Sequence, residues 1–127
     1  MNKPKTTIGR TEIVSFPELG IETITAKIDT GAYSTAIHTH KMWEQEDVGV
    51  KTLYFQLLDP SVDEFKNLLI KTTSYYTKKV RSSNGRIEER FIIRTPIILG
   101  GKKRMTHLGL TNREKMKFPV LIGRRVL

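Results

Sequence analysis

The dipeptide Asn84-Gly85 separates two long runs of strand-forming residues. Asn-Gly supplies the two positive-φ residues of a type I′ turn, which is the strongest short-range signal for a β-hairpin. The sequence therefore predicts a hairpin with two long arms. Charged residues crowd both sides of the turn, so we expect the tip to stand clear of the core. A second break at Gly100-Gly101 predicts another hairpin.

The rest of the chain has an all-β pattern, in which short runs rich in Ile, Val, Thr, Tyr and Phe alternate with Gly, Pro and Asn. Residues 16–20 read as a turn and residues 58–65 as a loop. Residues 40–48 could hold a single helical turn, and the last five residues could begin a short helix. The predicted strands are 11–16, 22–28, 35–40, 51–57, 69–81, 87–99, 104–110 and 120–122.

Size and composition narrow the class of protein. The 127 residues suit one domain, which should bury roughly two-thirds of its unfolded surface. No apolar run approaches the ~18 residues that span a membrane, and the first residues lack the apolar core of a secretory signal, so we expect a cytoplasmic protein without membrane contact. The chain has no cysteine, which excludes disulfides, thiol nucleophiles and thiolate zinc sites. Its net charge of +9 favours an acidic partner, either nucleic acid, an acidic protein tail or an anionic surface.

One short segment offers a catalytic carboxylate. Ile24, Ala26 and Ile28 alternate with polar residues in a strand that runs directly into Asp29-Thr30-Gly31. A turn that follows a buried strand is a place where a rigid scaffold can fix a catalytic group. An ordinary turn between two strands has the same local pattern, and the chain contains only one Asp-Thr-Gly.

Two histidines nearby raise the alternative of a metal site. His38 and His40 are predicted on the same side of a strand, so both could reach one ion, completed by His107 or Glu44. Zinc requires three or four such ligands, and the chain has no His-Glu-x-x-His helix. We interpret the pair as structural and expect neither a metal nor a cofactor.

A basic β-barrel that binds RNA is an alternative from another class. Such a protein would place aromatic side chains among its basic residues for base stacking. Tyr75, Tyr76 and Phe91 have basic neighbours, although no established RNA-binding motif is present.

Three ordered motifs carry a resemblance to a known family. "KIDTGAYSTAIH", "VRSSNGRIEERFIIRTPIILGG" and "LTNREKMKFPVLIGR" resemble the bacterial retropepsin-like family that has been labelled an ATP-dependent zinc protease and is associated with the RimK-type glutamate ligase. The resemblance covers roughly residues 8–127. It implies an all-β fold, a retropepsin-like closed β-barrel, with residues 10–127 as one domain after an N-terminal arm of residues 1–9. The Asn84-Gly85 hairpin would be its flap.

The resemblance also implies a mechanism. Aspartic peptidases need two carboxylates that share one proton, so a chain with one Asp-Thr-Gly would act as a homodimer with Asp29 from each subunit. Thr30 would brace the turn by hydrogen bonding, Gly31 would lie near the substrate, and Gly123 would let a late strand pass behind the turn. Ala32 cannot donate a hydrogen bond to the carboxylate as a serine would, which predicts an activity optimum nearer neutral pH.

The expected flap is strongly basic, which fits a substrate with added glutamates, such as the tail of a ribosomal protein, and a glutamate ligase as a partner. Tyr33 stands where the family usually has arginine, so the substrate here could differ. A retropepsin fold that keeps its dimer but has lost turnover remains a further alternative. The substrate-binding residues that the resemblance implies are Ala32, Arg81, Ser82, Ser83, Asn84 and Gly85.

Overall fold

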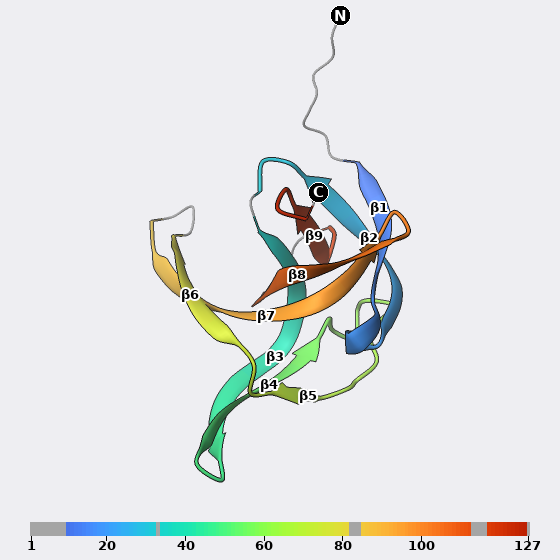
Figure 1. Ribbon diagram of the computed structural model, residues 1–127. Coiled ribbons are helices and arrows are strands. Elements are labelled where there is room, and N and C mark those ends of the chain that lie inside the picture. The colour runs from blue at the N-terminus through green and yellow to red at the C-terminus, as the bar shows by residue number, and fades with distance from the viewer. Residues whose placement is uncertain (1–9, 33, 82–84, 113–116, 127) are drawn as a thin grey trace, which may run out of the picture.

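The computed structural model describes residues 10–32, 34–81, 85–112 and 117–126, so the expected arm of residues 1–9 lies outside it. Strands make up most of the described chain (Figure 1). A single 3₁₀ turn, η1 (Pro17–Leu19), occupies the predicted turn after the first strand. The strands are β1 (Thr11–Phe16), β2 (Ile21–Asp29), β3 (Thr35–Asp47), β4 (Val50–Leu57), β5 (Ile70–Thr72), β6 (Tyr76–Arg81), β7 (Ile87–Leu99), β8 (Lys102–Thr111) and β9 (Val120–Gly123).

Six strands close into a barrel. β1 pairs with β2 and β7, β7 pairs with β8, β8 with β3, β3 with β9, and β9 returns to β2. The β2–β9 and β3–β8 pairs are parallel, and the others are antiparallel. This closed all-β barrel confirms the retropepsin-like fold expected from the sequence. Among the described residues, no helix is long and apolar enough to cross a membrane.

The alternation along β2 shows why the barrel forms. Ile24, Ala26 and Ile28 are at most 3% exposed and point into the core, whereas Thr25 lies on the outer face. Successive side chains of a strand point to opposite faces, so this pattern buries one face and leaves the other in water. Burial of such apolar side chains is the main stabilising contribution to the core. Leu108, Leu110, Val120 and Ile122 complete the same cluster.

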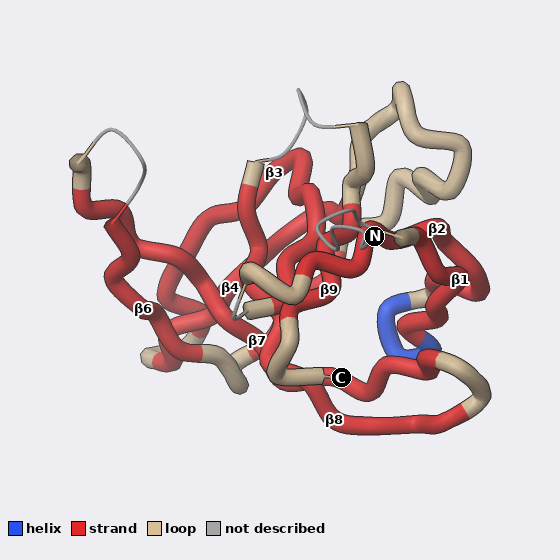
Figure 2. Tube along the Cα trace, turned by 90° about the horizontal axis from the view of Figure 1, so that it is seen from above, coloured by secondary structure: helices blue, strands red, loops and turns tan. Residues whose placement is uncertain are grey.

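Two hairpins extend beyond the barrel. The β6–β7 hairpin pairs from Tyr76↔Ile92 to Arg81↔Ile87 and reaches away from the barrel on one side (Figures 1 and 2). It corresponds to the hairpin predicted from Asn84-Gly85. The hairpin predicted at Gly100-Gly101 is also confirmed: both glycines have positive φ, at 61° and 79°, and they join β7 to β8.

Three predictions were wrong. Residues 40–48 are not a helical turn, because β3 continues to Asp47 and pairs with β4; that hairpin turns at Val48-Gly49, where φ is 52° and 80°. Residues 69–81 are not one strand, since β5 pairs with β4 whereas β6 pairs with β7. The last described residues form a turn in which the Val126 N–H donates to the Gly123 carbonyl at 3.2 Å, and they begin no helix.

Candidate active site

The Asp29-Thr30-Gly31 turn holds its carboxylate by backbone hydrogen bonds. Asp29 Oδ1 accepts a hydrogen bond from the Gly31 N–H at 2.9 Å, and the Asp29 carbonyl accepts one from the Ala32 N–H at 3.1 Å. Asp29 is half-buried, whereas Thr30 and Gly31 are exposed. A methyl group on Gly31 would lie 3.2 Å from Asp29 Oδ1, which is a tight contact. The turn therefore presents an oriented, half-buried carboxylate.

The end of β9 supports this turn from the neighbouring position in the sheet. Asp29 pairs with Gly123 in the parallel β2–β9 ladder. Immediately after the strand, the Arg124 N–H donates to the Ala32 carbonyl at 2.9 Å. The structure thus places Gly123 beside the turn, as the resemblance implied, and connects the segments before and after the turn to the C-terminal part of the chain.

Thr35 is a supporting residue that the sequence did not identify. Its hydroxyl oxygen accepts a hydrogen bond from the Gly123 N–H at 3.1 Å, and the side chain is 1% exposed. The sequence predicted Thr30 as the brace of the turn, but Thr30 is exposed. Among the described residues, the buried threonine that contacts this site is Thr35. No local pattern marks it, because its partner lies 88 residues away.

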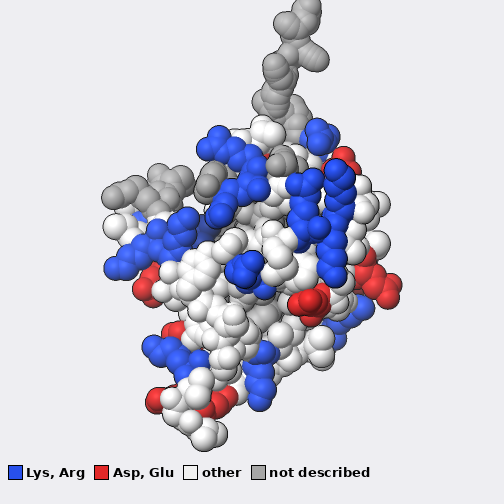
Figure 3. Space-filling model, in the orientation of Figure 1, with Lys and Arg blue, Asp and Glu red and all other residues white. Residues whose placement is uncertain are grey.

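Two of the predicted flap residues, Arg81 and Gly85, are among the described residues of the β6–β7 hairpin. Ser82, Ser83 and Asn84 fall outside the described residues. Arg81 is the last residue of β6, and Gly85 has a φ of 85°, as a glycine in a tight turn does. On the face shown in Figure 3, Lys and Arg side chains predominate over the upper part. The structure therefore places Arg81 and Gly85 at the described end of this hairpin, on a different part of the chain from the Asp29 turn.

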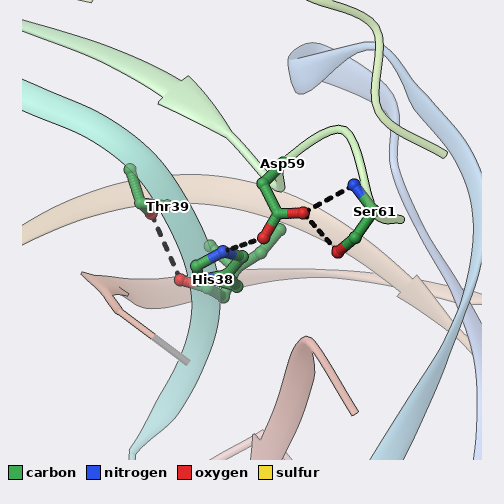
Figure 4. Close-up of polar contacts among 5 residues, drawn as sticks. His38, Thr39, Asp59 and Ser61 are labelled. Atoms are coloured by element: carbon green, nitrogen blue, oxygen red, sulfur yellow. Dashed lines mark hydrogen bonds and ion pairs between the residues drawn. The ribbon is translucent and has the colours of Figure 1, made fainter. Parts of the chain in front are cut away.

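The two histidines do not form a pair. His38 is buried, and its Nε2 lies 2.6 Å from Asp59 Oδ2 (Figure 4). Ser61 donates to Asp59 Oδ1 through its N–H at 2.7 Å and through its hydroxyl. His40 instead is exposed and meets the Phe65 ring edge-on. The predicted same-side arrangement is wrong, because the β3–β4 register shifts between Thr39 and Lys41.

The His38 contact is structural, since it fastens β3 to the loop that follows β4. The hydrogen bonds from Ser61, followed by the contact with His38, lower the pKa of the Asp59 carboxyl. Nowhere in the described ranges do three or more His, Cys, Asp or Glu side chains form a group that could hold a metal ion.

The aromatic residues considered for RNA stacking are largely occupied by internal contacts. Tyr75 and Phe91 pack edge-on against each other and against the core. The Tyr75 hydroxyl donates to Glu44 at 2.6 Å, and burial followed by this bond raises the pKa of Tyr75 to about 12. Tyr76 is more exposed, but its hydroxyl lies 2.9 Å from His107 Nδ1. Of these three residues only Tyr76 is exposed, and its ring meets that of His107 edge-on, so the set offers one ring on which a base could stack.

Comparisons with known proteins extend these observations. The model of a family described as RimB-like, "Retropepsin-like aspartic endopeptidase RimB", matches residues 7–127. A probable alpha-L-glutamate ligase from Shewanella halifaxensis is 32% identical over 129 residues, and one from Desulfotalea psychrophila is 33% identical over 123 residues. The alignments cover 100% and 97% of this chain but only 28% and 26% of the relatives, so the chain spans about a quarter of their length.

A solved structure shares the fold. The crystal structure of a protein of unknown function from Legionella pneumophila aligns with a TM-score of 0.68 and 28% sequence identity. The alignment covers 92% of this chain and 82% of that protein.

Proposed function

Since the chain belongs to the RimB-like family of retropepsin-like aspartic endopeptidases, we propose that it hydrolyses acidic or glutamate-modified peptides as a homodimer. The observation that carries this proposal is the Asp29 turn, whose carboxylate is oriented by Gly31 and supported by Gly123. In this proposal residues 10–127 form the peptidase domain and residues 1–9 precede it as an arm.

The homodimer follows from the chemistry of the reaction. Peptide hydrolysis by this class of enzyme needs two neighbouring carboxylates, and this chain has one Asp-Thr-Gly turn. An isologous interface uses the same surface patch twice, so two Asp29 residues can meet across a two-fold axis. The exposure of Thr30 and Gly31 in the protomer is compatible with such a contact.

The pair of Asp29 carboxyls would share one proton. The ionised carboxylate takes a proton from water as the water oxygen attacks the scissile carbonyl carbon, and the other carboxyl gives its proton to the carbonyl oxygen. Collapse of the resulting gem-diol breaks the C–N bond, and a proton passes to the leaving amine. The Gly31 N–H fixes one Asp29 oxygen throughout, so that the other oxygen faces the water.

The proposed substrate rests on charge and on the relatives. A chain with a net charge of +9 attracts acidic peptides, and arginine on the flap can bind both oxygens of a carboxylate. The similar glutamate ligases include a region that resembles this whole chain, which supports a glutamate-modified protein as substrate and a ligase as partner. In the flap, Arg81, Ser82, Ser83, Asn84 and Gly85 are the proposed substrate contacts.

The test is incubation of the wild type with a polyglutamylated peptide, followed by mass spectrometry of the products. We expect Asp29→Asn to abolish cleavage, because the amide can neither accept the proton from water nor share one with its partner. Asp63→Asn is a matched control, since Asp63 is an exposed carboxylate in the loop after β4. Undiminished cleavage by Asp29→Asn would refute the assignment, and RNA binding by both variants without any cleavage would favour the basic-barrel alternative.

A further inference from the structure

A pocket of about 80 Å³ opens between the base of the β6–β7 hairpin and the C-terminal turn. Its wall includes Ser34 and Thr35, which directly follow the segment with the Asp29 turn, and Tyr76 and Lys78 from β6. His107 from β8 and Arg125 from the C-terminal turn complete its polar lining. The pocket can hold several water molecules, or one carboxylate with a bound water.

The charge of this pocket is one-sided. Lys78 and Arg125 supply two cations, and no Asp or Glu lines it among the described residues. Two other pockets near η1 have a balanced lining, in which Lys66 accompanies Glu64 in one and Glu22 in the other. Basic side chains that line a concave site raise the local concentration of anions.

His107 adds a polar group without adding a fixed charge. Burial lowers the pKa of His107, and the charges of Arg125, Arg94 and Lys78 lower it further. The ring is therefore neutral near neutral pH. When the Tyr76 hydroxyl donates to Nδ1, at 2.9 Å, the proton of the ring lies on Nε2, which can then donate a hydrogen bond.

We infer, on the basis of the proposed peptidase function, that this pocket is a subsite for a side-chain carboxylate of the substrate, with Lys78, Arg125 and His107 as its donors. The place of the pocket, between the Asp29 turn and the proposed flap, supports this inference. One wall begins five residues after Asp29, and the other belongs to the strand that leads into the proposed flap. A peptide held under the flap with its scissile bond at Asp29 would therefore place a neighbouring side chain in the pocket.

The first test measures binding with a peptide of four glutamates, capped at both ends, in the Asp29→Asn background so that no cleavage occurs. We expect Lys78→Gln to weaken binding by about tenfold, because one charge-assisted hydrogen bond is lost. Lys103→Gln removes the same charge from an exposed position on β8 that does not line the pocket, and should change the affinity by less than about twofold. Equal losses of affinity in the two variants would overturn the subsite and leave only a general electrostatic attraction between the protein and the peptide.

The second test is spectroscopic and follows the pKa of His107 by NMR. The ring faces Tyr76 and Lys78 from β6, Arg94 from β7 and Arg125 from the C-terminal turn. A bound carboxylate offsets the surrounding positive charge, so the tetraglutamate peptide should raise the pKa of His107. The matching peptide of four glutamines should leave it unchanged. An identical His107 titration with and without tetraglutamate would contradict the inference.

Cleavage assays separate this inference from the proposed function. If wild type cleaves glutamate peptides and Lys78→Gln and Lys103→Gln reduce kcat/KM equally, the function holds and the subsite is wrong. If no glutamate peptide is cleaved while Lys78→Gln still selectively weakens tetraglutamate binding, the carboxylate site holds and the peptidase proposal fails. A single-stranded RNA that displaces the tetraglutamate peptide from the Asp29→Asn protein, but not when Lys78→Gln is also present, would show that the pocket binds RNA. That result would overturn the assignment to a peptide.

Discussion

Asp29 and Gly123 are direct partners in the parallel β2–β9 ladder, so the candidate catalytic carboxylate lies beside the last strand of the chain. The Gly123 N–H donates a hydrogen bond to the buried hydroxyl of Thr35. The two strand ends that flank the turn thus meet the last strand of the chain, and Thr35 connects the segment after the turn to β9.

Replacement of Thr35 by valine should destabilise the protein. The change keeps the shape of the side chain but leaves the buried Gly123 N–H without an acceptor, at a cost of about 1–3 kcal/mol in the free energy of unfolding. Thr95→Val is the matched control: Thr95 is also buried on a strand, and its hydroxyl has no hydrogen-bond partner among the described residues. Thr95→Val should be neutral or stabilising. Urea unfolding of both variants measures the difference, and equal effects would refute the role of Thr35.

Gly31→Ala should lower turnover more than stability. The added methyl group would lie 3.2 Å from Asp29 Oδ1 and would displace the carboxylate from its bond with the Gly31 N–H. Misplacement of a catalytic group by a fraction of an ångström can reduce kcat by about tenfold or more. In Gly109→Ala the methyl group would meet the Thr35 carbonyl at 3.5 Å and Ile92 at 3.6 Å, which are ordinary contacts, so that variant should keep its activity. Steady-state kinetics and thermal unfolding of both variants test the distinction.

Ala32→Ser should move the pH–rate profile toward acid. A hydroxyl beside the Asp29 pair could donate a hydrogen bond to the ionised form, which would lower the apparent pKa values of the pair. The wild type, which lacks this donor, should work best nearer neutral pH. The dependence of kcat/KM on pH for both proteins provides the measurement. A wild-type profile centred below about pH 4 would contradict the role given to Ala32.

Asp59→Asn should remove a contribution to the free energy of unfolding that depends on pH. Hydrogen bonds from Ser61, then the contact with His38, lower the pKa of Asp59 in the folded state, so its ionised form stabilises the fold. This contribution is complete above the unfolded pKa of about 4 and is lost as the pH falls through the lower folded pKa. Urea unfolding should therefore show a difference between wild type and Asp59→Asn at about pH 7 that shrinks below about pH 4. A constant difference over that range would exclude this linkage.

Local patterns predicted most of the barrel, because alternation and glycine turns act over a few residues. β1 and β7 have the predicted limits, and both glycine hairpins are present. The sequence did not predict the outer half of β3, because this half is largely exposed and lacks an apolar face. Its conformation depends on its pairing with β4 and on the stacking of Trp43 on Tyr54, whose ring centroids lie 5.3 Å apart.

The candidate turn could be recognised because its residues are contiguous, whereas contacts between distant segments could not be derived from the sequence. Asp29, Thr30 and Gly31 form one recognisable turn, and the carboxylate is oriented within it. Thr35 and His38 gain their roles only from partners that folding brings near, Gly123 and Asp59. No window of sequence contains both members of either contact, so neither role could be derived before the strand order was known.

If the active site exists only when two chains each supply Asp29, a subunit-mixing assay reveals it directly. Wild type is unfolded and refolded with increasing amounts of Asp29→Asn, and cleavage of a polyglutamylated peptide is measured per wild-type chain. Because a mixed dimer holds only one carboxylate, the activity per wild-type chain should fall to about half at equal amounts and to about a tenth at a ninefold excess of the variant. An activity per wild-type chain that does not change with added Asp29→Asn would show that each chain acts alone.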